Sequence, residues 1–385
     1  MRLLSGTRFV PIVAAFLLSC TDDPNPVGGS LLPATDQPVM KVDTVYASSH
    51  SVSRDILDNS GALRIMVGKN QFYEAWGLIK FTLPDSLVNA VITDAKITLR
   101  SGYYFGDTLA ALSFVAYRGK RSWFGDSLTV DSLKLGDYFD AAVSTPFSAV
   151  VGDTDNVQFS IDTGMVRQWF ANIPDTNQVN HGVILQPTNS GIIKGFKSFN
   201  TLNPEDHRPK LTIQYTKTGV SGTAAIIDGS YKYVADIGRV NLVQNPDRIY
   251  VQAGVAYNGY INFISTSPVP ARASVHKAEL EVVLDSSLTR LNKYSVDSLA
   301  AYYVGPTGVD FFIQAAVSDT VMISGKKVYR FQIQQYMQRW VRGAAAGLAL
   351  FTYSEADVMD LFTFYGWTAS KELRPRIIVT YSPTQ

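Results

Sequence analysis

Hydrophobic and polar residues alternate along much of this chain, with the period of two that is typical of a β-strand buried on one face. In the segment 92–99, Ala95, Ile97 and Leu99 share one face, whereas charged and hydroxyl residues occupy the other. Such segments predict half-buried strands packed in a sandwich or barrel. We therefore predict an all-β protein.

The pattern occurs twice, in the same order. Each copy has a short strand, an alternating strand, a strand that leads into a short amphipathic helix, another short strand, and a last strand that begins with Arg-Pro. The Arg-Pro pairs lie 166 positions apart and Trp169 lies 171 positions before Trp340, which indicates a duplicated domain with loop insertions rather than a solenoid. The corresponding segments are 77–81 and 259–263, 92–99 and 275–282, 159–170 and 331–341, 181–185 and 346–350, and 208–215 and 374–381.

A chain of 385 residues is long enough for two domains of ordinary size. We predict two tandem β-sandwich domains of jelly-roll-like form, each with a short helix. The first covers 40–216 and the second 226–385. The segment 217–225, which contains Gly219-Val220-Ser221-Gly222, is polar and glycine-rich, and we predict that it is a linker.

The composition excludes several classes of protein. Hydrophobic residues make up 46% of the chain, which is enough to build large cores, and charged residues make up only 17%. The net charge is +1, and the chain lacks the concentrated basic patch that nucleic-acid binding requires. A single cysteine excludes an intrachain disulfide and a zinc site built on cysteines.

That cysteine, Cys20, ends a segment typical of an export signal. Arg2 and Arg8 provide positive charge, and 9–18 is an apolar run. The run is shorter than the roughly 20 residues that span a bilayer. Leu17-Leu18-Ser19-Cys20 resembles a bacterial lipobox, which implies a signal peptide at 1–19, a lipidated and acylated Cys20, and a tether at 20–39. The alternative is an ordinary secretory signal with an incidental cysteine.

Two acidic residues follow the cysteine. Thr21-Asp22-Asp23 resembles the signals that direct lipoproteins of Bacteroidetes-type bacteria to the outer membrane, and 25–33 resembles the N-terminal motif of an uncharacterised lipoprotein family of these bacteria. The resemblance implies a membrane contact through the N-terminal lipid and a position at the cell surface, with the periplasmic face as the alternative. The alternative is a polar spacer, rich in Pro and Gly, without a sorting role.

The order of elements resembles the DNRLRE-type domain, a β-sandwich of bacterial surface proteins related to carbohydrate-binding modules. The first copy carries the family's Tyr117 and Ser122-Trp123 segment, an aspartate-led helix over 162–169, and the closing Arg-Pro strand. The second copy lacks the Ser-Trp segment and has Gln334 in place of the aspartate. The resemblance covers about 45–216 and 230–382, and it implies a fold rather than a function.

No motif predicts catalysis. The four histidines, His50, His181, His207 and His276, lack the spacing of metal ligands, and the chain contains no nucleophile elbow or phosphate-binding loop. We therefore predict that the protein is not an enzyme and needs no cofactor. The segment 152–156 offers oxygen ligands for Ca²⁺, although it lacks the distal glutamate of an EF-hand loop, and an acidic surface turn is the preferred interpretation.

Aromatic residues are the candidates for ligand binding, because sugar rings stack on flat aromatic side chains. The alternative is that these residues pack between the sheets. Trp169 and Trp340 occupy repeated helical positions, and we predict that they are anchors in the core or at the domain edge. The candidates near loops or strand ends are Trp76, Tyr103, Tyr104, Trp123 and Trp367.

Aspartate followed by Ser or Thr and an aliphatic residue recurs along the chain. The pattern resembles the O-glycosylation sequon of Bacteroidetes-type bacteria, whereas the alternative is that Asp-Ser and Asp-Thr pairs favour turns before strands. The candidate hydroxyl residues are Thr44, Ser86, Thr108, Ser127, Ser132, Ser298 and Thr320.

The first functional hypothesis is a non-enzymatic, lipid-anchored envelope protein that binds a polysaccharide or another surface macromolecule. The second is a structural or assembly component whose sandwich faces bind envelope proteins. An enzyme with a dispersed site is a weaker third. Exposed aromatic residues on one face would favour glycans, whereas a broad apolar patch would favour a protein partner.

Overall fold

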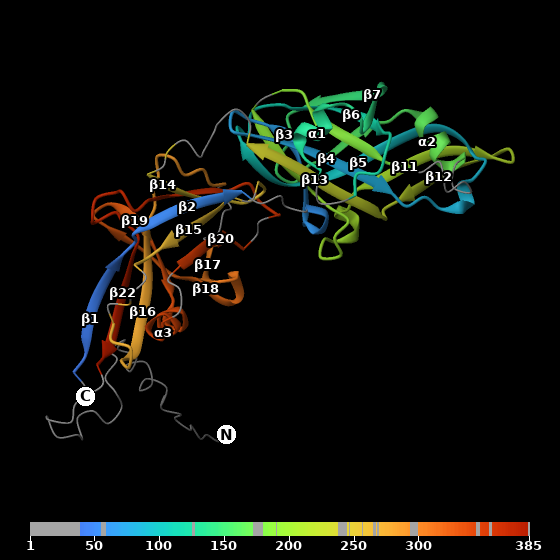
Figure 1. Cartoon of the computed structure of the whole chain (residues 1–385). Coiled ribbons are helices and arrows are strands. Elements are labelled where there is room, and N and C mark those ends of the chain that lie inside the picture. The colour runs from blue at the N-terminus through green and yellow to red at the C-terminus, as the bar shows by residue number, and fades with distance from the viewer. Residues whose placement is uncertain are drawn as a thin grey trace, which may run out of the picture. The chain divides into compact units, whose positions relative to one another are not determined.

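The protein was analysed as a computed structural model. It describes residues 39–54, 59–124, 128–171, 180–189, 191–237, 245, 247–255, 257–264, 267, 269–292, 299–343, 347–353 and 356–383. All of the described strands and helices belong to the compact unit Lys41–Gln385. They form antiparallel sheets with a few short helices, and the prediction of a mostly β protein with a sandwich arrangement is confirmed (Figure 1).

The first sandwich is formed by the strands β3 to β13. Its hydrogen-bonded order is β12-β11-β5-β10-β3-β4-β9-β6-β7, with β13 beside β4 and β8 beside β5. The elements are η2 (Asn59–Gly61), β3 (Arg64–Lys69), β4 (Tyr73–Phe81), η3 (Asp85–Leu87), β5 (Val91–Gly106), β6 (Leu112–Gly119), α1 (Val130–Lys134), β7 (Phe139–Ala149), β8 (Asn156–Ser160), α2 (Thr163–Ala171), β9 (Val183–Pro187), β10 (Ile192–Lys197), η4 (Glu205–His207), β11 (Lys210–Lys217), β12 (Val220–Ile226) and β13 (Gly229–Ile237).

The second sandwich combines two strands from the start of the described chain with the strands β14 to β22. Its order is β1-β22-β16-β19-β18-β17-β20-β15-β14-β21, with β2 beside β15. The elements are β1 (Lys41–Tyr46), β2 (Ser49–Arg54), β14 (Arg248–Gln252), β15 (Tyr257–Asn262), β16 (Ser274–Val283), β17 (Leu299–Gly305), β18 (Gly308–Ile323), β19 (Lys326–Gln332), α3 (Gln334–Val341), β20 (Gly347–Thr352), β21 (Leu361–Tyr365) and β22 (Arg376–Ser382).

One long strand in each sandwich passes from one sheet to the other. In β5, the residues up to Thr98 pair with β11, and Ser101 to Gly106 pair with β10. In β18, the first part pairs with β17 and the second with β19, and the register shifts between Val317 and Asp319. Such irregularities bend a strand and increase its twist, which closes each sandwich at one side.

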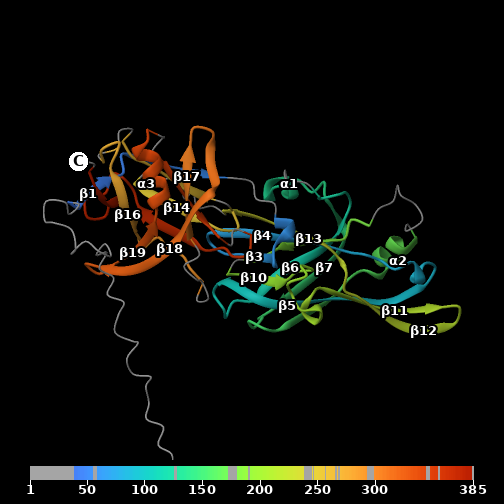
Figure 2. The same ribbon diagram turned by 90° about the horizontal axis from the view of Figure 1, so that it is seen from below.

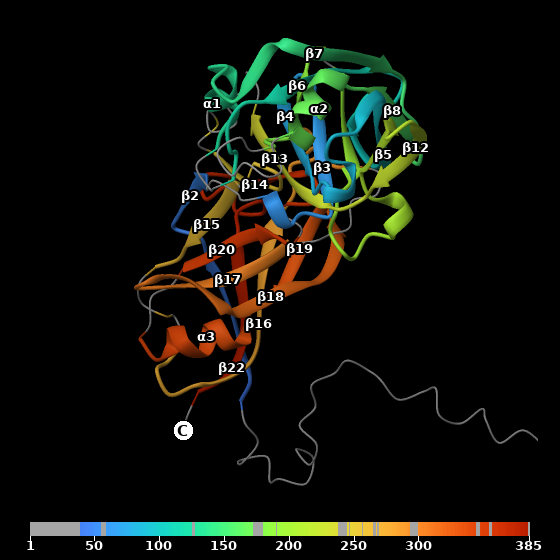
Figure 3. The ribbon, with the colours of Figure 1, turned by 90° about the vertical axis from the view of Figure 1, so that its right-hand side faces the viewer.

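The two sandwiches repeat the same pairings, as the sequence duplication predicts. The pairs β4–β9, β6–β9 and β5–β8 in the first correspond to β15–β20, β17–β20 and β16–β19 in the second. The helix α2 contacts β5, and α3 contacts β16. Figure 2 shows α2 near β11 and β5, and Figure 3 shows α3 beside β16 and β22.

The sandwiches exchange strands, and this differs from the predicted domain boundaries. The strands β1 and β2 pair with β22 and β15 of the second sandwich, and in Figure 1 these blue strands lie among orange and red ones. In the first sandwich the equivalent places beside β11 and β4 are taken by β12 and β13. Hence 41–54 belongs to the second sandwich and 220–237 to the first, and the predicted division at 216 and 226 is wrong.

The predicted linker is wrong for a local reason. Thr218 and Gly219 have φ values of +50° and +81°, and positive φ at both central positions is what a two-residue type I′ hairpin turn requires. The chain therefore reverses at once, and β12 pairs with β11 from Lys217–Val220 to Leu211–Ile226. Within 217–225, Lys217 ends β11, residues 218–219 form the turn, and residues 220–225 belong to β12 at the edge of the sheet.

The predicted alternation is confirmed in the core. Ala95, Ile97 and Leu99 are fully buried in the first sandwich, because β5 presents this face to the opposite sheet. Trp169 and Trp340, on the two repeated helices, are 5% and 1% exposed, as predicted for core residues.

Candidate functional site

A cavity of 720 Å³ lies where loops of the first sandwich meet the segment that follows β16. Its volume falls within the range of about 300–1,000 Å³ that is common for small-molecule sites. Aromatic and polar side chains line it together. Those on which the argument rests are Gln71, Phe72, Tyr104, Asp107 and Arg290.

The turn between β3 and β4 positions the first ring. The side-chain oxygen of the buried Asn70 accepts hydrogen bonds of 2.8 Å from the backbone N–H groups of Phe72 and Tyr73. This capping fixes a short turn whose own backbone groups would otherwise lack partners. Phe72 is half-buried and packs against the edge of the core, so that its ring borders the cavity.

The end of β5 contributes the neighbouring wall. Tyr104 and Phe105 are the last aromatic residues of this strand, and both line the cavity. The exposed Asp107 follows them, and one of its carboxylate oxygens accepts a hydrogen bond from the N–H of Leu109 over 2.9 Å. Tyr104 and Phe105 are 9% and 6% exposed, so most of each ring packs in the core and only a small part borders the cavity beside the Asp107 carboxylate.

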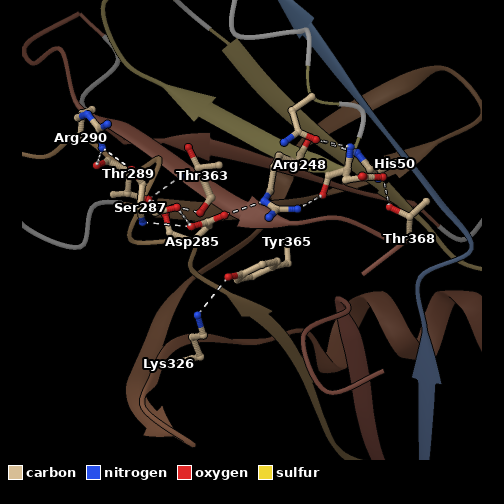
Figure 4. A network of polar contacts seen from close by, with 12 residues as sticks. His50, Arg248, Asp285, Ser287, Thr289, Arg290, Lys326, Thr363, Tyr365 and Thr368 are labelled. Atoms are coloured by element: carbon tan, nitrogen blue, oxygen red, sulfur yellow. Dashed lines mark hydrogen bonds and ion pairs between the residues drawn. The ribbon is translucent and has the colours of Figure 1, made fainter. Parts of the chain in front are cut away.

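A polar network in the second sandwich holds the opposite wall, which is formed by Thr289 to Asn292. Arg248 donates from Nε to the Oδ2 of Asp285 over 2.7 Å, and the Thr289 hydroxyl donates to the backbone oxygen of Asp285 over 2.8 Å. Figure 4 shows Arg248 between Asp285 and His50, and its guanidinium carbon lies 4.4 Å from the ring centre of Tyr365. The network orders the segment that carries Arg290.

Asp285 is the buried acid of this network. Burial acts to raise its pKa, but hydrogen bonds from Ser287 and Arg248 outweigh burial and hold the pKa below its usual value. The side chain is 4% exposed. Asp285 is therefore a carboxylate at neutral pH and a fixed partner for Arg248.

Arg290 joins the aromatic and polar parts of the site. Its Nη1 donates to the backbone oxygens of Ser287 and Thr289 over 2.9 and 2.7 Å, and its guanidinium carbon lies 5.3 Å from the ring centre of Phe72. A guanidinium has five N–H donors, so several remain for a ligand. The half-buried ring of Phe72, beside fixed donors and an exposed carboxylate, is suited to the apolar face and hydroxyl groups of a sugar.

Most of the aromatic residues predicted to bind a ligand are buried. Trp76 is 0% and Trp123 1% exposed, and their indole N–H groups donate to Glu74 Oε1 and to the backbone oxygen of His181. Neither offers a ring face to a ligand, and both predictions are wrong, because these side chains fill a separate apolar cluster with Leu78 and Leu133.

The other three candidates differ from one another. Tyr103 is 4% exposed, and its hydroxyl oxygen accepts a hydrogen bond from the N–H of Met359 over 2.9 Å, so its binding role is corrected to packing. Tyr104 lines the 720 Å³ cavity, although it is 9% exposed and packs mainly in the core. Trp367 is 39% exposed but lies outside that cavity. Only Tyr104 is thus brought to the candidate site.

Phe72 and Arg290 were not among the sequence candidates. Phe72 lies between Asn70 and a strand, and the Asn-x-Phe turn is a local signal that points to an ordered loop. Arg290 has no such signal, because its position depends on Arg248 and Asp285, which are 37 residues apart.

The candidate O-glycosylation residues have different surroundings. Thr44, Ser86 and Thr108 are exposed, and Thr320 is half-buried. The hydroxyl of Ser132 donates to the backbone oxygen of Thr129 over 2.8 Å within the capping box of α1. Cys20, Ser127 and Ser298 lie outside the described residues.

The segment considered for Ca²⁺ uses its carboxylates within the protein. Asp155 accepts a hydrogen bond from the N–H of Gly152 over 2.7 Å, and Asp153 lies 3.6 Å from the Lys194 ammonium. Within the described ranges, no three His, Cys, Asp or Glu side chains are grouped to hold a metal ion. In the same part of the chain, no helix has the length and apolar character needed to cross a membrane.

Comparison with known proteins gives little further information. No protein-family model matches the chain, and no curated protein sequence does. A protein of Parabacteroides distasonis, described as secreted, is 11% identical with a TM-score of 0.25, over 90% of this chain and 100% of that one. A Macrobrachium rosenbergii nodavirus structure is 10% identical with a TM-score of 0.14, over 99% of this chain and 96% of that one. At these values the similarities assign neither family nor function.

Proposed function

We propose that the chain is a non-enzymatic envelope protein that binds a polysaccharide or a similar surface macromolecule, anchored by a lipid on Cys20 at the outer membrane and facing the cell surface. The observation that carries the binding role is the cavity beside Phe72, Tyr104 and Arg290. Aromatic faces and a few fixed polar groups that converge in a concave site are typical of small-molecule and sugar recognition.

Replacement of Phe72 by alanine tests the cavity. Because truncation of a central aromatic residue in a binding site costs about 2 kcal/mol or more, Phe72→Ala should weaken glycan affinity about thirtyfold. The measurement is isothermal titration of residues 40–385 with neutral and acidic polysaccharides. Circular dichroism of the variant shows whether the fold is retained.

Phe312→Ala is the matched control, because it removes the same side chain from a position outside the cavity that is 99% exposed. It should leave glycan affinity unchanged. If wild-type protein binds no polysaccharide, or if Phe72→Ala binds as well as wild type, this assignment is wrong.

A second candidate function, the binding of a partner protein, is favoured by the hairpin of β17 and β18. Phe311 and Phe312 in β18 are 62% and 99% exposed, and Phe311 contacts Tyr302 and Phe351. Exposed aromatic residues are enriched at protein interfaces. The test is co-purification from membranes. A membrane protein that co-purifies with wild type and is absent with Phe312→Ala would support this function over glycan binding.

The anchor is tested separately. Cys20→Ser removes the thiol that forms the thioether, so the variant should leave the membrane fraction or remain unprocessed. A variant that is processed and sediments with membranes as wild type does would contradict the lipid anchor.

A further inference from the structure

A second cavity, of 370 Å³, has four basic residues of the first sandwich among the residues that line it. Arg64 begins β3, Arg100 lies in β5, Lys197 ends β10 and His207 ends the turn η4. The charges of Arg64, Arg100 and Lys197 around one small volume are unusual in a nearly neutral protein, because like charges repel one another when water is partly excluded.

The two acidic side chains of the cavity already have other partners. Asp153 lies 3.6 Å from the ammonium of Lys194, which is 1% exposed, and Asp360 accepts a hydrogen bond from the N–H of Asn292 over 3.0 Å. Across the residues that the structure describes, neither Arg100 nor Lys197 forms an ion pair. Because a neutral N–H does not cancel the charge of Asp360, the count includes it together with Asp153 and with Asp357, which acts on Lys197. The four cationic groups of Arg64, Arg100, Lys194 and Lys197 outnumber these three carboxylates by one.

Lys197 shows the effect of this crowding. Burial lowers its pKa, and the charge of Arg64 lowers it further, against an opposing contribution from Asp357. Gly102 lets the lysine approach, since a Cβ at this position would lie 2.9 Å from Lys197 Cε. The end of the Lys197 side chain therefore occupies the space that a side chain at position 102 would need.

Two buried donors in the wall of the cavity are unsatisfied. The hydroxyl of Ser101, a residue that is 2% exposed, has no hydrogen-bond partner among the described residues, and the same is true of Nε of Arg64. Buried donors without partners are uncommon and unfavourable. A ligand with several acceptor oxygens would satisfy them.

We propose that this cavity is a binding site for an anionic group, a carboxylate or a sulfate ester of an acidic polysaccharide. Arg64, Arg100 and Lys197 supply the charge, and Ser101 supplies a hydrogen bond. Charge-assisted hydrogen bonds to an oxyanion are about twice as strong as neutral ones, which favours acidic over neutral sugars. The identity of the ligand as a glycan rests on the proposed function, whereas the anion site rests on the cavity alone.

The main test compares a double variant with a matched control by isothermal titration. Arg100→Gln with Lys197→Gln removes two charges from the cavity, and Lys120→Gln with Lys210→Gln removes two from exposed positions outside it. The probes are polygalacturonate, dextran sulfate, neutral dextran and inorganic sulfate. The cavity variant should lose about tenfold or more in affinity for the acidic probes, and the control should not. The two acidic polymers show whether carboxylate or sulfate is preferred.

Two single variants test the anion site independently if the double variant folds poorly. Gly102→Ala displaces only the flexible end of Lys197, so it should weaken acidic binding while the melting temperature stays nearly constant. Ser101→Ala removes an unsatisfied buried hydroxyl, so it should raise the melting temperature and still weaken binding about tenfold.

The outcomes separate this inference from the proposed function. Equal binding of neutral and acidic polymers, or equal acidic binding by wild type and the cavity variants, would overturn the anion site and leave glycan binding intact. Binding of inorganic sulfate that depends on Lys197, without binding of any polymer, would support the anion site and contradict the glycan function.

Discussion

The hydroxyl of Tyr381 donates a hydrogen bond to Oδ2 of Asp43 over 2.8 Å, and this contact joins β22 to β1. Hydrogen bonding to the carboxylate, together with burial, raises the pKa of Tyr381. The two strands pair from Lys41–Tyr381 to Tyr46–Arg376. Strands from the two ends of the described chain thus lie side by side, with the whole first sandwich inserted between β2 and β14.

The insertion predicts which fragments fold. A fragment of residues 245–383 lacks β1 and β2, so it loses the partners of β22 and β15 and the buried Val45. Exposed strand edges of this kind favour aggregation. We expect this fragment to be unfolded or aggregated. A chain in which residues 245–383 are followed by a short flexible linker and then by residues 39–54 regains β1 and β2, and it should fold.

Urea denaturation monitored by circular dichroism shows whether each fragment unfolds cooperatively and is therefore folded. A fragment of residues 59–237, which contains all the strands of the first sandwich, is the control and should fold. Cooperative unfolding of 245–383 on its own would show that the strand exchange is not needed for stability.

Two of the tryptophans predicted to contact a ligand should differ in their effect on stability when they are replaced by alanine. Trp76 is fully buried and donates to Glu74, so Trp76→Ala should lower the free energy of unfolding by about 3–5 kcal/mol. Trp367→Ala, at a position that is 39% exposed, should change it by about 0.5 kcal/mol or less and leave glycan affinity unaltered. Urea denaturation and titration measure the two quantities. A strong loss of glycan affinity in Trp367→Ala would place a binding surface there.

The network behind the candidate site makes a prediction about pH. The folded-state pKa of Asp285 is lowered, so its contribution to stability is present above the unfolded-state pKa of about 3.9 and is lost as the pH falls through the folded value. Asp285→Asn should therefore destabilise the protein by about 1–3 kcal/mol at pH 7, and the difference should shrink below about pH 4. The exposed Asp228→Asn is the control and should have little effect at either pH. A constant difference between wild type and Asp285→Asn from pH 7 to pH 3 would contradict this role.

The sequence patterns predicted the local structure well because strand alternation and helix amphipathicity are local. The buried face of β5 and the tryptophan-bearing helices α2 and α3 follow directly from periodicity. The exchange of β1 and β12 could not be predicted, since the two copies have similar edges and a strand pattern does not specify its partner.

Of the residues that line the candidate site, only Tyr104 was predicted from the sequence, because the other candidates depend on packing that a local pattern does not reveal. Whether a tryptophan is buried depends on what packs against it, and Trp123 is covered by contacts that no local pattern reveals. The cationic cavity collects Arg64, Arg100 and Lys197 from three different strands, and neighbouring strands in this sheet are far apart in the sequence. Spacing along the chain therefore carries no signal for it.

The surroundings of the Asp-Ser and Asp-Thr residues make the last prediction. A transferase needs an accessible hydroxyl on a segment that can leave its hydrogen bonds, and Thr108 is exposed in the turn after β5. Ser132 has its hydroxyl within the capping box of α1, so its modification would cost about 1 kcal/mol of cap stability. If the sequons are used, peptide mass spectrometry of protein from its native host should find glycan on Thr108 and none on Ser132, and Thr108→Ala should lower the intact mass by one glycan. An intact mass equal to that of the acylated polypeptide would show that the sequons are not used. Glycan on Ser132 would show that a hydroxyl bound in the helix cap is modified as readily as an exposed one, which contradicts this prediction.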